Sequence, residues 1–126
     1  MGSLSGRRIL VVEDEFLISA MLCDMLADAE ATTVGPASTV ADALHLIRFN
    51  DIDASILDMN LNGEWSDPVA EVLLDRGIPF LFTTGYGKNE RSDRFGAPTV
   101  SKPYSWEAVE AQLHQCLKVG TRPPLP

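Results

Sequence analysis

The sequence contains few cysteines and few histidines, and both shortages argue against a metal or redox centre built from these residues. Its 126 residues include two of each. Cys23 and Cys116 lie far apart on segments with helical periodicity and form no Cys-x-x-Cys pair, so we expect both to be small buried residues. His45 and His114 also lie on helical segments without neighbouring ligands. We therefore expect no histidine or cysteine metal site.

Long apolar runs are absent as well, and basic residues are in the minority. No run approaches the roughly 20 residues that cross a bilayer, and the first eight residues lack the apolar core and cleavage site of a signal peptide. Ten Lys and Arg face 18 Asp and Glu, and the formal net charge of −8 opposes binding to a phosphate backbone. We expect a cytoplasmic protein without a membrane partner and without direct nucleic acid binding.

The chain has the composition of a globular domain and alternates short apolar segments with helical ones. Hydrophobic residues make up 45% of it and charged residues 22%, which suits one domain that buries a core. Strands are predicted over residues 9–13, 32–34, 54–58, 79–84 and 98–101. Helices are predicted over residues 16–28, from Ser38 or Thr39 to about 47, from 67 to about 76, and from Ser105 to about 117.

Three segments between these elements are predicted to be irregular. Gly35-Pro36 is expected to end the second strand, residues 60–65 read as a loop, and a fourth helix within Gly85–Gly96 is doubtful because that region lacks apolar periodicity. The alternation of strand and helix predicts an α/β fold, a doubly wound five-stranded parallel sheet with helices on both faces. Ligands of such sheets bind beyond the carboxyl ends of the strands.

The first strand ends in three adjacent acids, in the stretch "ILVVEDE". Like charges repel, and buried carboxylates without a compensating cation are destabilising by several kcal/mol, on the order of 3–5. A cation is therefore expected next to Glu13 and Asp14. Glu15 falls on the first turn of the next helix, so we expect it to serve the helix dipole or solvent rather than a metal.

Polar residues also end the third, fourth and fifth predicted strands. Asp58, Thr84 and Lys102 would therefore share one rim with Glu13 and Asp14. Three carboxylates suit a hard divalent cation such as Mg²⁺, while Lys102 and Thr84 could hold an anion. A site that holds both a cation and an anion suits a phosphoryl group, and a carboxylate there could act as the nucleophile.

This ordered set of residues closely resembles the receiver domain of two-component response regulators. The resemblance covers about Arg8 to Leu117 and implies the flavodoxin-like or CheY-like strand order 2-1-3-4-5. We expect a flexible N-terminus over residues 1–7, the receiver domain over 8–118 and a disordered tail over 119–126. The stretch Phe82-Thr83-Thr84-Gly85-Tyr86 is further similar to the FATGUY subgroup, many of whose members are single-domain proteins.

The resemblance implies a role for each acid of the rim. Asp58 would accept the phosphoryl group from a sensor histidine kinase or a phosphotransfer protein. Glu13, Asp14, Asp58 and the backbone carbonyl of Asn60 would hold Mg²⁺. The sequence departs from many receivers at Asn62, where they have a proline four residues after the acceptor.

The resemblance also implies how a signal would leave the site. Thr84 would bond a phosphoryl oxygen and carry the signal, and Lys102 would pair first with Asp58 and then with the phosphate. The Lys102-Pro103 bond is expected to be cis, as in the family. Many receivers have a switching aromatic where this chain has Thr99, which cannot fill the same cavity. Tyr86 is an alternative moving aromatic, although a static place on the loop is favoured for it.

Three functions stay open at this point. The first is a signalling module, not an enzyme, that works through an unknown downstream protein as a stand-alone receiver or a phosphorelay member. The second is a receiver-like binding module without phosphorylation. The third is a phosphohydrolase that uses Asp58 as a transient nucleophile, which is disfavoured because Asn60 stands where hydrolases of that kind have a second acid. A weak homodimer through the last helices and strand is also left open.

Overall fold

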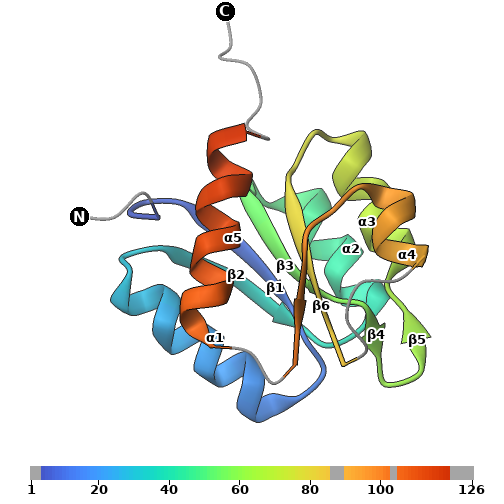
Figure 1. Cartoon of the computed structure of the whole chain (residues 1–126), viewed down its shortest axis with the longest axis horizontal. Helices are drawn as coiled ribbons and strands as arrows, with labels where there is room; N and C mark the ends of the chain where they lie inside the picture. The colour runs from blue at the N-terminus through green and yellow to red at the C-terminus, as the bar shows by residue number, and fades with distance from the viewer. Residues whose placement is uncertain (1–3, 86–89, 103–104, 120–126) are drawn as a thin grey trace, which may run out of the picture.

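The protein forms a parallel sheet covered by helices on both faces (Figure 1). The computed structural model describes residues 4–85, 90–102 and 105–119. The large sheet has the order β2-β1-β3-β6-β7 and consists of β1 (Arg8–Val12), β2 (Thr32–Ala37), β3 (Ala54–Asp58), β6 (Phe80–Thr84) and β7 (Thr99–Ser101). A second sheet pairs β4 (Asn60–Leu61) with β5 (Glu64–Trp65). The predicted α/β class and the order 2-1-3-4-5 of the large sheet are confirmed.

Each face of the sheet has its own hydrophobic core. The helices are α1 (Phe16–Asp28), α2 (Val40–Phe49), α3 (Asp67–Asp75), α4 (Glu90–Phe95) and α5 (Trp106–Val119). Successive strand residues point to opposite faces, so Val11 packs with Leu22 and Leu113 of α1 and α5. Leu10 points to the opposite face, where it packs in a core that includes Ile47 of α2 and buried residues of α3 and α4. Among the helices described, none combines the length and apolar character needed to cross a bilayer.

The predicted helix boundaries have identifiable chemical causes. The Thr39 hydroxyl accepts a hydrogen bond from the Asp42 N–H at 3.1 Å, so Thr39 rather than Ser38 caps α2. The Ser105 hydroxyl likewise accepts from the Ala108 N–H at 3.2 Å. Pro68 lies in the first turn of α3, where its missing N–H is not needed. Local sequence therefore decides where these helices begin.

The predicted end of the second strand at Gly35-Pro36 is wrong, because β2 continues to Ala37. Proline can lie in this strand because β2 is an edge strand and needs fewer N–H donors. Gly35 has φ +94°, and an added Cβ would lie 2.9 Å from the Ala37 nitrogen and 3.1 Å from the Val11 oxygen. Only glycine fits there without a shift of the backbone.

The predicted loop over residues 60–65 is also wrong, because this segment forms the β4–β5 hairpin. Asn60 pairs with Trp65 and Leu61 with Glu64. The two residues between the strands are Asn62 at φ 53° and Gly63 at φ 93°. An Asn-Gly pair with positive φ at both positions is the preferred two-residue hairpin turn, so a local signal for this hairpin was present in the sequence.

Other expectations need smaller corrections. Part of the doubtful Gly85–Gly96 region forms α4, whose Phe95 packs in the core. Part of the N-terminus expected to be flexible packs on the domain, since Leu4 is 1% exposed. Cys116 is buried as predicted, whereas Cys23 is only half-buried on α1. The expected tail at 119–126 lies outside the described residues except for Val119, which ends α5.

Candidate functional site

Three carboxylates meet at the carboxyl ends of β1 and β3. Glu13, Asp14 and Asp58 each offer an oxygen that lies within 4.8 Å of the other two. Because β1 and β3 are neighbours with Val12 opposite Leu57, the residues that follow them come together. Glu13 and Asp58 are each 3% exposed, and Asp14 is half-buried. The predicted acids of the rim therefore form one largely buried cluster.

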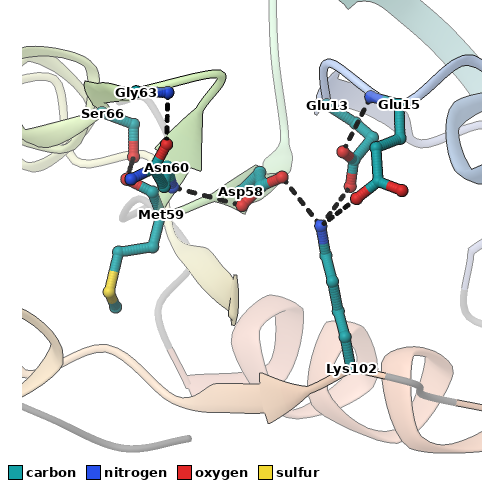
Figure 2. A network of polar contacts seen from close by, with 8 residues as sticks. All are labelled: Glu13, Glu15, Asp58, Met59, Asn60, Gly63, Ser66 and Lys102. Carbon is teal, nitrogen blue, oxygen red and sulfur yellow. Dashed lines mark hydrogen bonds and ion pairs between the residues drawn. The ribbon is translucent and has the colours of Figure 1, made fainter. Parts of the chain in front are cut away.

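Lys102 enters this cluster from the other side (Figure 2). Its Nζ lies 2.9 Å from Asp58 Oδ2, 3.3 Å from Glu13 Oε1 and 3.3 Å from Glu15 Oε1. The Lys102 N–H donates to the Thr84 carbonyl at 2.8 Å, which fixes its backbone next to the end of β6. One cation thus faces several carboxylates, and the site as a whole keeps an excess of negative charge.

The pKa values in the cluster reflect burial and this excess charge. Burial raises the pKa of Glu13 to about 8, and its hydrogen bond with Asp58 acts in the same direction. Burial also raises the pKa of Asp58, although its hydrogen bonds with Glu13 and Lys102 oppose the shift. For Lys102 burial lowers the pKa, but the hydrogen bond and charge of Asp58 outweigh it and the net pKa is raised. Burial thus disfavours the charged forms of both Glu13 and Asp58 in the metal-free site.

Glu15 has a different place from the one expected. It is the N-cap residue of α1 rather than part of its first turn, and its side chain makes no cap hydrogen bond. Its N–H donates to Glu13 Oε2 at 3.0 Å, and its exposed carboxylate lies 3.3 Å from Lys102 Nζ. Glu15 thus lies outside the group of acids that could hold a metal among the described residues, and besides solvent its carboxylate contacts Lys102. The contact with Lys102 spans 87 residues of sequence, so no local pattern indicates it.

The segment that follows Asp58 is held by hydrogen bonds to Asp58 and between its own residues (Figure 2). The Asn60 N–H donates to Asp58 Oδ1 at 3.2 Å, and Asn60 Oδ1 accepts from the Gly63 N–H at 2.7 Å. The Ser66 N–H and hydroxyl both donate to the Met59 carbonyl, at 3.0 and 3.1 Å. Ser66 is the N-cap residue of α3, and its role in closing this segment was not predicted from the sequence.

The structure describes only some of the residues that were expected to carry the signal. Thr84 is 3% exposed at the end of β6. Thr99 lies opposite Phe82 in the sheet, and its hydroxyl is buried without a hydrogen-bond partner in the described part of the chain. Next to Phe82, the rings of Phe80 and Phe95 lie 5.3 and 5.9 Å away and fill this side of the core with aromatics. Tyr86 and Pro103, with its expected cis bond, lie outside the described residues.

Two large apolar side chains are exposed at the start of α1, beside the acidic cluster. Phe16 is 79% exposed and Leu17 82%. They follow directly after Glu15, on the rim where the acids lie. Exposed apolar side chains at the mouth of a charged site are typical of a surface that a protein partner covers.

The residues present fit a hard divalent cation. Glu13 Oε1 is buried without a hydrogen-bond donor among the described residues, and its charged neighbour is Lys102. Oxygen ligands from two or three carboxylates, with open space for water on the Asp14 side, are the donor set that Mg²⁺ prefers. On that side a groove of about 550 Å³ is lined by Asp14, Ser38, Thr39, Leu61, Asn62 and Glu64.

Solved structures of other proteins resemble this chain in both sequence and fold. The solution structure of SdrG from Sphingomonas melonis Fr1 is 43% identical to this chain, with 93% of this chain and 99% of SdrG covered and a TM-score of 0.77. The non-phosphorylated HemR receiver domain from Leptospira biflexa is 27% identical, with 94% and 99% covered and a TM-score of 0.81. No protein-family model matches the chain.

A curated relative of greater length also matches. The transcriptional regulatory protein TcrA of Mycobacterium tuberculosis is 35% identical over 98% of this chain. The chain spans about half the length of the curated relatives it matches. Fold, site and relatives together define a receiver domain of two-component signalling. The chain belongs to the response regulator receiver (CheY-like) family.

Proposed function

We propose that this receiver accepts a phosphoryl group on Asp58 from the phosphohistidine of a sensor histidine kinase or a phosphotransfer protein. The observation that carries the proposal is the position of the Asp58 carboxylate. One of its oxygens lies 2.9 Å from Lys102 Nζ, and the carboxylate belongs to the cluster with Glu13 and Asp14. A nucleophilic oxygen thus lies between a cation from the chain and a site for a second cation.

In this transfer a carboxylate oxygen of Asp58 forms a bond to phosphorus while the phosphorus–nitrogen bond of the donor breaks. The imidazole leaves with the electron pair of that bond and takes up a proton. Glu13, Asp14, Asp58 and the Asn60 carbonyl would hold Mg²⁺, which when bound supplies positive charge to the transferring oxygens. Lys102 would pair with the Asp58 carboxylate before the transfer and with the phosphate after it. Thr84 would donate a hydrogen bond to the phosphate.

A solved structure of a similar receiver is consistent with this proposal. A second SdrG structure, 43% identical over 93% of this chain, is described as the BeF3-activated conformation. Beryllofluoride stands in for a phosphoryl group, so an activated form of a similar receiver supports phosphorylation here. We propose that the chain belongs to the FATGUY subgroup because of its Phe82-Thr83-Thr84-Gly85-Tyr86 stretch. We further propose that the protein is cytoplasmic and signals by binding a protein partner.

The deciding experiment is Mg²⁺-dependent labelling with acetyl phosphate, which needs no kinase. The native chain should take up one acid-stable and alkali-labile phosphate, and Asp58→Asn should take up none. Asp67→Asn is a matched control, since Asp67 is an acid at the start of α3 outside the cluster. Failure of the native chain to label under conditions that label another receiver would favour a binding module without phosphorylation.

The phosphohydrolase remains the weaker alternative. Asn60 donates its N–H to Asp58 and uses its side-chain oxygen to close the hairpin turn. A carboxamide in that position does not ionise near neutral pH, so it cannot act as a general acid or base. Repeated turnover of a phosphomonoester by the native chain, instead of a single stoichiometric label, would support the phosphohydrolase function.

A further inference from the structure

The β4–β5 hairpin begins two residues after the proposed phosphoacceptor. Its first residue is Asn60, which pairs with Trp65 across the hairpin. Asn60 is also the residue whose backbone carbonyl we assign to Mg²⁺. The hairpin therefore holds part of the site on regular structure instead of on an open loop.

The turn of the hairpin is closed by the side chain of Asn60. Asn62 and Gly63 have φ values of 53° and 93°, the combination that a two-residue turn of this kind requires. The Gly63 N–H donates to Asn60 Oδ1 at 2.7 Å. Formation of the turn and placement of the Asn60 side chain are consequently linked.

Asn60 is in turn bonded to the acceptor. Its N–H donates to Asp58 Oδ1 at 3.2 Å, while Lys102 Nζ lies 2.9 Å from Asp58 Oδ2. The two carboxylate oxygens are thus held from opposite sides, one by the hairpin and one by the lysine. The far strand of the hairpin is anchored as well, since Glu64 Oε1 accepts from the Val40 N–H at 3.4 Å at the start of α2.

We infer that the Asn62-Gly63 turn is a positioning element for the phosphoryl site. It fixes Asn60, which orients the Asp58 carboxylate and holds the carbonyl assigned to the metal. The inference rests on the proposed function for its metal ligand, and it assigns a role to residues 60–64 beyond that function.

The test is the substitution Gly63→Ala with Gly6→Ala as its matched control. Gly63 has φ +93° and Gly6 φ +76°, and an added Cβ would meet nothing within 4 Å at either position. Both substitutions therefore act through the backbone conformation, without a steric clash. Gly6 lies in the turn before β1, where its N–H donates to the Glu30 carbonyl, so only Gly63→Ala disturbs the hairpin.

The first readout is the dissociation constant of Mg²⁺ alone, measured by calorimetry and by Trp65 fluorescence in a Trp106→Phe background. The left-handed conformation is disfavoured for alanine by an amount that corresponds to an affinity change of about fivefold or more. Gly63→Ala should weaken Mg²⁺ binding by that factor, and Gly6→Ala should not. Gly63→Asn should restore most of the affinity, because asparagine tolerates positive φ.

The second readout needs no metal. In EDTA the amide of Asn60 should exchange with solvent about fivefold faster or more in Gly63→Ala than in the native chain, while Gly6→Ala leaves it unchanged. Equal Mg²⁺ affinity and equal Asn60 exchange in Gly63→Ala and the native chain would overturn the inference. If the native chain binds no Mg²⁺ and takes up no label, the proposed function fails, and the exchange of the Asn60 amide still decides whether the turn positions it.

Discussion

Glu13 makes the stability of the metal-free protein depend on pH in a direction unusual for a carboxylate. Its pKa rises from 4.5 to about 8 in the folded protein, chiefly through burial. Between these values the folded protein holds a proton that the unfolded chain has released, so stability falls as pH rises. The slope is about 1.4 kcal/mol per pH unit for one such group. Between pH 5 and pH 7 the loss is about 3 kcal/mol, equivalent to about 10 °C in Tm for a domain of this size.

The assay is urea denaturation in EDTA at pH 5, 6 and 7 for the native chain and Glu13→Gln. The amide keeps the size of the side chain but cannot ionise, so Glu13→Gln should show little of the native slope. Asp24→Asn is the control, because it removes one negative charge from an exposed position on α1. Saturating Mg²⁺ should flatten the native slope, since the metal replaces the proton. Equal losses between pH 5 and pH 7 in the native chain and Glu13→Gln would refute the reasoning.

Three further outcomes follow from the same structure. Lys102→Met should lower the stability of the metal-free protein by about 3 kcal/mol in urea, because it leaves buried carboxylates without their cation; a change below 0.5 kcal/mol, on the order of an exposed ion pair, would contradict this. Leu17→Asp should slow transfer from a phosphohistidine donor about tenfold, because Leu17 is 82% exposed beside the acids, yet leave labelling by acetyl phosphate unchanged; equal slowing with both donors would show that Leu17 does not contact the partner. Burial raises the pKa of Cys116 to about 11, so mass spectrometry at pH 8 should find it alkylated more than tenfold slower than the half-buried Cys23, and equal rates would contradict its burial.

The strands and most helices follow from local patterns in the sequence. The segment from Ile9 to Val12 is apolar throughout because β1 is covered on both faces. The hydroxyls of Thr39 and Ser105 cap the helices that follow them. The carboxyl ends of parallel strands share one edge, so the meeting of Glu13 and Asp14 with Asp58 is also predictable from the order of the elements.

The errors made from the sequence have specific physical causes. Gly35-Pro36 reads as a strand end, but the edge position of β2 tolerates proline, and edge positions depend on the whole sheet. Residues 60–65 read as a loop because each strand of the hairpin has only two residues, although the Asn-Gly turn itself was visible. The short α4 has almost no apolar periodicity and is held instead by Phe95 in the aromatic core and by Arg94, which reaches Asp67 of α3 at 3.2 Å.

The class of fold, the edge of the sheet where the site lies and the residue types that gather there are all predictable from the amino-acid sequence. These depend on hydrophobic periodicity and on the end of each strand, both of which are local properties. Three features of the site depend instead on tertiary packing. Lys102 reaches Glu15 as well as Asp58, burial raises the pKa of Glu13 to about 8, and a hairpin turn is bonded to the acceptor through Asn60. Distances between side chains from different elements, and the loss of water around them, arise when the chain packs, and no local pattern encodes them.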